Sequence, residues 1–387
     1  MRRILLILAV MVVGSLGVVT AATASNEAAP RTTPSILAPS ATVAYAPAAG
    51  ATEVDPRSPV TVTVQDGTFD TVTLTNADGE PVAGALNADR TSWSTSEPLG
   101  YGSSYTWSGT ATGGDGAAVP LEGSFTTVAP TDTVRGILNI DGRTVGIAAP
   151  IEIQFDAHVE DRAAVERNLS VTTSVPVEGA WGWLPDENGG SRVHWRPKEY
   201  WPAYTTVTVQ ANLYGVPYGG GAYGVADLST TFEIGRAQIV KADVTTHRMI
   251  VMRDGQQVAD YPASYGLATD PNRNTRSGIH VVTEKFTDKR MVSERYDYDV
   301  VSKWSVRISN NGEFIHANPA SVDAQGNSNV THGCINLSTE NAKAYYDTAL
   351  YGDPVEVTGT PIALSAQDGD IWDWTLSWEQ WQTLSAL

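Results

Sequence analysis

From residue 42 to residue 128, apolar and polar side chains alternate with a period of two. Residues 60–64 alternate valine with threonine, and a second alternating run covers residues 72–75, with the turn pair Asp66-Gly67 between them. This alternation is typical of strands that bury one face, and short strands separated by turn residues indicate a β-sandwich. We therefore predict that residues 42–128 form a β-sandwich.

A second unit with the same pattern covers residues 129–235. Its alternating runs include residues 151–155 and 206–209. The two units also end on similar segments, 121–125 and 228–232, each of which begins with Leu and ends with Phe. A repeat on this scale supports tandem modules of one architecture. We predict two immunoglobulin-like sandwiches in series.

The third unit, residues 236–360, is predicted to be β-rich with one main helix. Two apolar runs flank the turn pair Asp254-Gly255, an arrangement that favours a tight hairpin. The helix is expected to begin after Ser338, a good N-cap, and to end near residue 350. The predicted strands include 249–252, 257–260, 277–282 and 355–357.

The segment 361–387 is a Trp-rich C-terminal extension. Ser377 and Gln380 have the spacing of a capping box, which predicts a helix. Three tryptophans fall on one face of a helical projection: Trp374, Trp378 and Trp381. We predict that these side chains attach the extension to the third unit. A ligand-stacking platform is the less favoured alternative.

The beginning of the chain has the pattern of an export signal. A basic segment, residues 1–3, precedes an apolar run, 4–19, and small residues up to Ala24. We predict a signal peptide at 1–24, followed by a flexible linker rich in Ala, Pro, Ser and Thr at 25–41. The alternative is an uncleaved anchor, in which case this segment alone would contact the membrane. We expect an exported protein of the cell wall or periplasmic space.

Composition and net charge limit the classes of molecule that the protein is expected to bind. Only 18% of residues are charged, and the formal net charge is −18. An acidic chain does not attract nucleic acid or an anionic membrane by bulk electrostatics. The chain has one cysteine, and an unpaired cysteine in an exported protein indicates a reactive thiol. One cysteine and nearby histidines match no familiar zinc ligand set, so no metal is expected.

The single cysteine, Cys334, lies in surroundings suited to a nucleophile. Gly333 beside it lets the backbone turn tightly and present N–H groups to an oxyanion. A thiol also needs a base. His316 and His332 are both candidates, and the residues alone favour His316 modestly, since the turn-prone loop 317–331 could bring it back against the thiol.

His316, a spacer, and then Thr331-His332-Gly333-Cys334-Ile335-Asn336 resembles the signature of the YkuD-type L,D-transpeptidases. The resemblance covers almost the whole chain after the signal segment, and two immunoglobulin-like modules before the catalytic domain are typical of the actinobacterial and mycobacterial members. It is carried further by the strand Ser277-Gly278-Ile279, by Asn310-Asn311-Gly312, by Gly352-Asp353 and by the Trp-rich extension.

The resemblance implies a role for each of several residues. Cys334 would be the nucleophile and His316 the base, oriented by the carbonyl of Ala317. Backbone N–H groups around His332 and Gly333 would hold the oxyanion. The substrate-binding residues implied in the same way are Tyr298, Asn311, Gly312, Asn336, Met291, Trp304 and Thr331.

The implied reaction joins two peptidoglycan tetrapeptide stems, one as donor and one as acceptor. Cys334 would form a thioester with release of D-Ala, and a side-chain amine would then produce a 3→3 cross-link without any cofactor. Carbapenem-type β-lactams are the implied inhibitors. The alternatives are an L,D-carboxypeptidase and a non-catalytic wall-binding protein. A papain-like peptidase is disfavoured because there the cysteine precedes the histidine, whereas His316 precedes Cys334.

Overall fold

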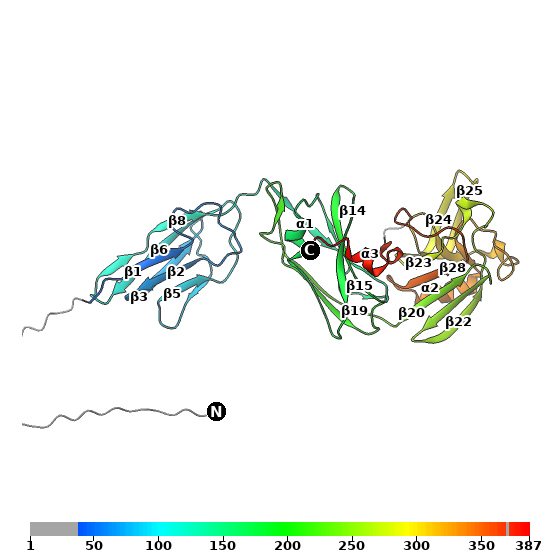
Figure 1. The fold of residues 1–387 in the computed structure, drawn as a ribbon, viewed down its shortest axis with the longest axis horizontal. Helices are drawn as coiled ribbons and strands as arrows, with labels where there is room; N and C mark the ends of the chain where they lie inside the picture. Colours follow the sequence, from blue (N-terminus) through cyan, green and yellow to red (C-terminus); the bar gives the residue numbers. More distant parts are fainter. Residues whose placement is uncertain (1–37, 369–370) are drawn as a thin grey trace, which may run out of the picture.

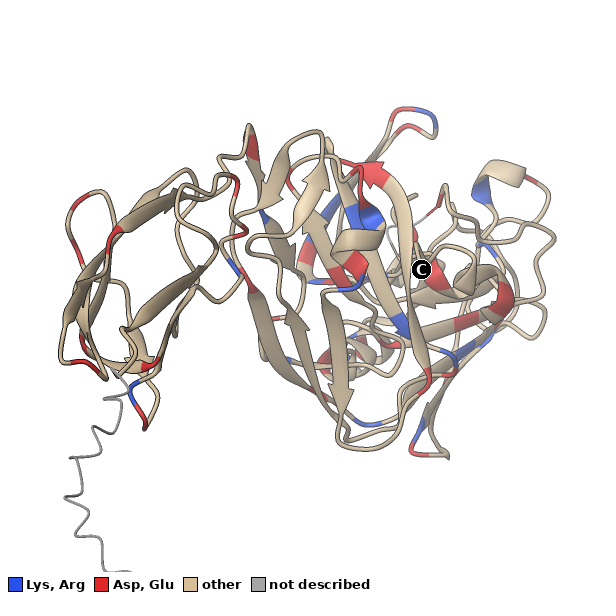
Figure 2. Cartoon of the chain, turned by 60° about the vertical axis from the view of Figure 1, so that its left-hand side comes forward, with Lys and Arg blue, Asp and Glu red and all other residues tan. Residues whose placement is uncertain are grey.

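Three β-rich domains follow one another along the molecule (Figure 1). The structure is a computed structural model that describes residues 38–368 and 371–387. The predicted signal peptide and most of the predicted linker lie outside the described residues. No helix within the described ranges is long and apolar enough to cross a membrane. Figure 2 shows Asp and Glu spread over all three domains.

The first domain is a sandwich whose two sheets enclose aromatic and aliphatic side chains, Trp93 and Trp107 among them. One sheet has the order β1-β2-β5-β4, and in the other β6 pairs with β3, β7 and β8. The strands are β1 (Thr42–Ala46), β2 (Thr61–Gln65), β3 (Gly67–Thr75), β4 (Gly84–Leu86), β5 (Ser92–Thr95), β6 (Ser104–Gly113), β7 (Ala118–Pro120) and β8 (Gly123–Thr126).

The second domain has two four-stranded sheets, β10-β12-β15-β14 and β11-β19-β16-β13, and a small sheet, β17-β18-β9. Its one helix, α1 (Arg162–Glu166), is capped by Asp161. The strands are β9 (Asp132–Val134), β10 (Gly136–Leu138), β11 (Thr144–Val145), β12 (Ile151–Phe155), β13 (Leu169–Thr173), β14 (Gly179–Glu187), β15 (Gly190–Pro197), β16 (Thr206–Ala211), β17 (Pro217–Gly219), β18 (Ala222–Gly224) and β19 (Leu228–Ile234).

The third domain joins a five-stranded sheet, β22-β21-β20-β28-β23, to a four-stranded sheet, β24-β25-β26-β27. The strands are β20 (Gln238–Asp243), β21 (Arg248–Arg253), β22 (Gln256–Pro262), β23 (Gly278–Val281), β24 (Glu284–Ser293), β25 (Tyr298–Arg307), β26 (Phe314–Ala317), β27 (Ile335–Leu337) and β28 (Pro354–Thr358). Two short 3₁₀ segments, η1 (Pro271–Arg273) and η2 (Pro319–Ser321), lie in its loops.

Local signals in the third domain act as predicted. Asp254 and Gly255 both have positive φ, 47° and 80°, as a two-residue hairpin turn requires. Helix α2 (Thr339–Thr348) starts after Ser338, whose side chain accepts a hydrogen bond from the backbone N–H of Asn341. The predicted fold class, two immunoglobulin-like sandwiches followed by a β-rich domain with one main helix, is confirmed.

The Trp-rich tail forms η3 (Asp373–Thr375) and helix α3 (Trp378–Gln382), and the predicted capping box of Ser377 and Gln380 is present. The prediction of one helical face is wrong for Trp374. Leu376 is extended, with φ −96° and ψ 141°, so the chain breaks between the two segments.

The predicted docking surface of the tail is also wrong. The tail attaches mainly to the second domain, where the Trp381 indole donates to the carbonyl of Ala180 at 2.9 Å. Gly182 of β14 permits this approach, because a Cβ there would lie 2.9 Å from the indole. The guanidinium of Arg196 lies over the rings of three tryptophans, Trp374, Trp378 and Trp381, at 4.7, 5.5 and 5.1 Å. Periodicity shows that a face is buried but not which surface covers it.

A buried ion pair also fixes the tail to the second domain. His194 of β15 and Asp373 of η3 are both fully buried, and His194 Nδ1 lies 2.9 Å from Asp373 Oδ1. Ile371 packs with Ala148 of the second domain and Val281 of the third. In Figure 1 the tail accordingly lies between these two domains. We call residues 371–387 the clasp.

Candidate active site

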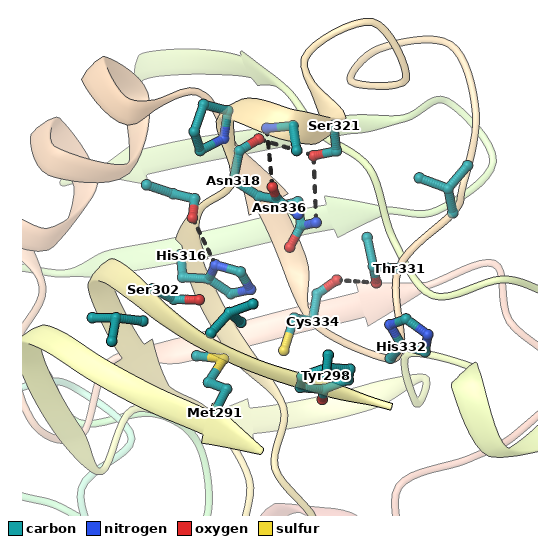
Figure 3. Close-up of a pocket in the computed structure, with 16 residues that line it drawn as sticks. Met291, Tyr298, Ser302, His316, Asn318, Ser321, Thr331, His332, Cys334 and Asn336 are labelled. Atoms are coloured by element: carbon teal, nitrogen blue, oxygen red, sulfur yellow. Dashed lines mark hydrogen bonds between the residues drawn. The ribbon is translucent and has the colours of Figure 1, made fainter. Parts of the chain in front are cut away.

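His316 and Cys334 come together because β26 and β27 are parallel neighbours. Ile315 pairs with Ile335 and His316 with Asn336. Side chains two residues apart on a strand share a face, so Cys334, just before β27, lies on the same side as Asn336 and the imidazole (Figure 3). The loop 317–331 is the crossover between the two parallel strands, and it returns the chain to the histidine as the sequence predicted.

A cavity of about 370 Å³ lies over these residues, between the hairpin β24–β25 and the crossover loop. Apart from two histidines, the residues that line it are uncharged. The predicted residues that line it are Met291, Tyr298, His316, Ala317, Thr331, His332, Cys334 and Asn336. Ala320 also lines the wall.

The imidazole of His316 is held as a neutral base. It is 6% exposed, and its Nδ1 lies 2.9 Å from the carbonyl oxygen of Ala317. A carbonyl only accepts hydrogen bonds, so Nδ1 carries the proton and Nε2 keeps its lone pair. Burial lowers the pKa of His316 below its ordinary value of 6.5, although the Ala317 carbonyl acts in the opposite direction. The ring is therefore uncharged at neutral pH.

Cys334 is held as a protonated thiol. Its Sγ donates to the carbonyl oxygen of Gly312 at 3.6 Å. Burial raises the pKa of the thiol to about 12, and the negative charge of Glu313 adds to the effect. A thiol with this pKa is not a nucleophile at rest. The site is a neutral thiol beside a neutral imidazole, which requires proton transfer to a base as the sulfur attacks.

The backbone around the thiol offers two free donors. Thr331 Oγ1 donates to the carbonyl of Cys334 at 2.6 Å and accepts from the N–H of Gly333 at 3.2 Å. Gly333 has φ of +116°, which favours glycine. The prediction of its N–H as an oxyanion donor does not fit this geometry, since that N–H already has an acceptor. Within the described ranges, the N–H groups of His332 and Cys334 donate to no other group.

The hairpin β24–β25 covers the mouth of the cavity with aromatic side chains. Tyr296 and Tyr298 lie against the ring of His332, with centroids 4.5 and 5.3 Å apart. Burial and the charge of Arg273 lower the pKa of His332. Burial also raises the pKa of Tyr298, so its hydroxyl stays protonated and can donate. This packing makes His332 part of the wall.

Three predicted substrate-binding residues do not line the cavity. Trp304 has φ of 54°, which turns it out of the alternation of β25, and its ring packs against Tyr346 of α2 at 5.4 Å. Asn311 bonds to Ser309 and, at 3.4 Å, to Asp368. Neither residue lines the cavity. Gly312 does not line it either, and its carbonyl accepts the hydrogen bond from Cys334 Sγ.

Sequence reasoning missed the charged cluster beneath the thiol. Glu313 is 2% exposed and accepts from the backbone N–H of Arg276 at 3.0 Å. Arg276 Nε lies 2.7 Å from Asp368 Oδ1. His280, read from the sequence as an ordinary strand residue, is fully buried, with Nε2 2.8 Å from the Arg276 carbonyl. The only signal was the carboxylate three residues before His316. No group of three metal-ligating side chains occurs in the described part of the chain.

Two family models match this chain. The model described as a bacterial Ig domain matches residues 51–217, and the model described as the L,D-transpeptidase catalytic domain matches residues 237–357. The second match contains both β26 and β27, and with them His316 and Cys334.

Individual proteins extend the likeness to most of the chain. L,D-transpeptidase 5 of Mycobacterium tuberculosis (strain ATCC 25618 / H37Rv) is 58% identical over 351 residues, which is 90% of this chain and 78% of the relative. L,D-transpeptidase 2 of M. tuberculosis (strain CDC 1551 / Oshkosh) is 38% identical, over 87% of this chain and 83% of the relative. The solved structure of the LD transpeptidase LdtMt1 in complex with imipenem has a TM-score of 0.50 and 33% identity, and covers 59% of this chain and 100% of that chain.

The chain therefore belongs to the L,D-transpeptidase family. The resemblance predicted from the signature around Cys334 is confirmed, and so is the class of enzyme.

Proposed function

We propose that this L,D-transpeptidase forms 3→3 cross-links between peptidoglycan stems through a thioester on Cys334. The donor is a tetrapeptide stem whose terminal D-Ala leaves, and the acceptor is a side-chain amine of a second stem. The observation that carries the proposal is the pairing of β26 with β27, which sets a neutral imidazole beside a protonated thiol.

In the first step, Sγ attacks the carbonyl carbon before D-Ala while its proton passes to His316 Nε2. The C–N bond then breaks, and the imidazolium gives the proton to the departing amine of D-Ala. The free N–H groups of His332 and Cys334 are available to the oxyanion, and the Tyr298 hydroxyl is a third donor.

In the second step, the acceptor amine attacks the thioester carbonyl. The C–S bond breaks, and one amine proton passes by way of His316 to the sulfur, which restores the thiol. Both steps use one base, and no charged side chain of the described residues lines the cavity to compete with it.

We propose that the enzyme acts outside the cytoplasm, after export through residues 1–24. The two sandwich domains would then set the distance between the wall and the catalytic domain. Since LdtMt1 was solved in complex with imipenem, we also propose that β-lactams of this type acylate Cys334.

The decisive experiment incubates the purified protein with a defined disaccharide tetrapeptide and identifies the products by mass spectrometry. Wild type is expected to release D-Ala and yield a 3→3 dimer, and Cys334→Ala is expected to yield neither. Release of D-Ala without dimer would replace the proposal with carboxypeptidase activity. Dimer formation by Cys334→Ala would overturn the role of the thiol.

A further inference from the structure

One short segment, the loop 273–275, contacts both peptide groups that carry the free donors of the active site. The N–H of His332 belongs to the same peptide group as the carbonyl of Thr331. The N–H of Cys334 likewise belongs to the same peptide group as the carbonyl of Gly333. A trans peptide group is planar, and its C=O and N–H bonds point in opposite directions. A residue that fixes one of these carbonyls therefore also fixes the direction of the N–H.

Arg273 holds the first of the two peptide groups. Its Nε donates to the carbonyl of Thr331 at 3.0 Å, and its Nη2 donates to the carbonyl of Val330. The backbone N–H of Leu267 donates to the Thr331 carbonyl as well, at 3.2 Å. A guanidinium is permanently charged and has its donors in a rigid plane. A charged donor at the carbonyl oxygen polarises the peptide group, which makes its N–H a stronger donor.

Thr275 holds the second peptide group. It is fully buried, and its Oγ1 donates to the carbonyl of Gly333 at 2.7 Å. The direction of this hydrogen bond is certain, because Oγ1 also accepts from the backbone N–H of Gly266 at 2.9 Å. A backbone N–H can only donate and a carbonyl can only accept, so the single hydroxyl proton of Thr275 lies toward Gly333.

The loop 273–275 lies outside the cavity. Thr331, His332 and Cys334 line the cavity (Figure 3), whereas no residue of the loop does. The two carbonyls thus point to the loop, away from the cavity, and the N–H groups of His332 and Cys334 point the other way. Within the described ranges neither N–H has an acceptor. Both donors are therefore free for an oxygen that lies beside Cys334 Sγ.

We propose that Arg273 and Thr275 are positioning residues of the oxyanion hole, which aim the N–H groups of His332 and Cys334 by holding the carbonyls of the same peptide groups. The inference rests on the proposed function, since it concerns the oxyanion of that acyl transfer. As Sγ bonds to the carbonyl carbon, its proton passes to His316 Nε2 and the π electron pair moves to the carbonyl oxygen. The two N–H groups then donate to the negative oxygen.

The test compares two reactions of Cys334 in Arg273→Met and Thr275→Val. Acylation by imipenem forms an oxyanion, and its rate is expected to fall about tenfold in each variant, less than the 10²- to 10³-fold typical of losing an oxyanion donor outright. Alkylation by iodoacetamide forms a C–S bond and releases iodide, and no oxygen gains charge. Its rate is expected to stay within about twofold of wild type. Intact-mass time courses measure both reactions.

Thr205→Val is the matched control. Thr205 is 1% exposed and donates to the carbonyl of Pro202 at 2.7 Å, but it lies in the second domain. Both rates are expected to stay at the wild-type value in this variant. Thr275→Ser and Arg273→Lys keep a donor and are expected to restore most of the acylation rate.

Two results would overturn the positioning role. One is acylation of Arg273→Met and Thr275→Val at the wild-type rate, and the other is a fall in alkylation equal to the fall in acylation, which would indicate a purely structural effect. Failure of imipenem to acylate the wild-type protein would instead count against the proposed function itself.

Discussion

Two buried histidines in this chain have pKa values that are shifted in opposite directions. His316, on the wall of the active site, is 6% exposed, and His194, under the clasp, is fully buried. The first gives its Nδ1 to a neutral carbonyl, that of Ala317, and its pKa is lowered. The second faces the carboxylate of Asp373. Burial is the largest single influence and works against the charge, but the carboxylates of Asp373 and Glu152 together outweigh it and raise the pKa of His194.

The comparison teaches that the acceptor beside the ring, and not the depth of burial, decides the state of the imidazole. A carbonyl leaves the catalytic ring free to take a proton. A carboxylate holds the ring of the clasp in its charged form, where it stabilises a docked segment. One residue type therefore serves as a base in one domain and as a cationic anchor in another.

The largest expected effect is on catalytic activity, which depends on His316 and not on His194. His316→Gln removes the base, and acylation of Cys334 by imipenem is expected to slow by about 10²- to 10⁴-fold. His194→Gln changes the same residue type outside the cavity and is expected to leave that rate within about twofold. Intact-mass time courses measure both. Equal losses would show that the two rings are not functionally distinct.

The next largest effect concerns the ion pair under the clasp. Asp373→Ala leaves His194 buried without its partner, and the second domain is expected to lose about 3–5 kcal/mol of stability. Urea unfolding followed by tryptophan fluorescence measures the change. The control Asp299→Ala breaks the exposed pair with Arg290 and is expected to leave the unfolding midpoint unchanged. A small effect of Asp373→Ala would contradict the anchoring role.

A smaller loss of stability is expected when Arg196 is changed. Arg196 is 2% exposed, its guanidinium lies over three indoles, and its Nη2 donates to the carbonyl of Leu376 at 3.1 Å. Arg196→Lys keeps the charge but loses the planar stacking, at a cost of about 1–2 kcal/mol. Faster hydrogen exchange in residues 371–387 measures the loss. Hydrogen exchange as slow as in the wild-type protein would show that the three ring contacts contribute little to the stability of the clasp.

The smallest expected effect is a difference in pH dependence between the process that depends on His194 and the one that depends on His316. Because the pKa of His194 is raised, its contribution to stability is complete below about 6.5 and is lost as pH rises through the raised value, so exchange in the clasp accelerates. Because the pKa of His316 is lowered, acylation stays level through neutral pH and falls only below 6.5 as the base is protonated. An acylation rate that rose steadily with pH would indicate thiolate attack instead.

Short-range patterns allowed much of the fold to be predicted. The Asp254-Gly255 hairpin, the cap at Ser338 and the capping box of Ser377 each depend on residues a few positions apart. Their outcome is decided locally, so the sequence is enough. The signature around Cys334 likewise identified the family, because its spacing reflects one crossover between two parallel strands.

The features that could not be predicted depend on distant partners. The tryptophan spacing indicated a buried face but not that β14 supplies Gly182 to receive it. The resemblance implied that Trp304 binds substrate, but its φ is positive and its ring packs against Tyr346 instead of lining the cavity. Asn336 Nδ2 donates to Ser321 Oγ in the crossover loop, a contact that the periodicity of β27 does not show.

The clasp also imposes an order on the making of the protein. The N–H of Ala386 donates to Glu166 of the second domain, 220 residues earlier in the chain. Domains emerge from N- to C-terminus during synthesis, so the catalytic domain must be made before the clasp can reach β14. Until then, Leu184, which the clasp covers with Trp372 and Trp381, stays uncovered. A chain interrupted within the catalytic domain is thus expected to expose an apolar patch and to be prone to aggregation.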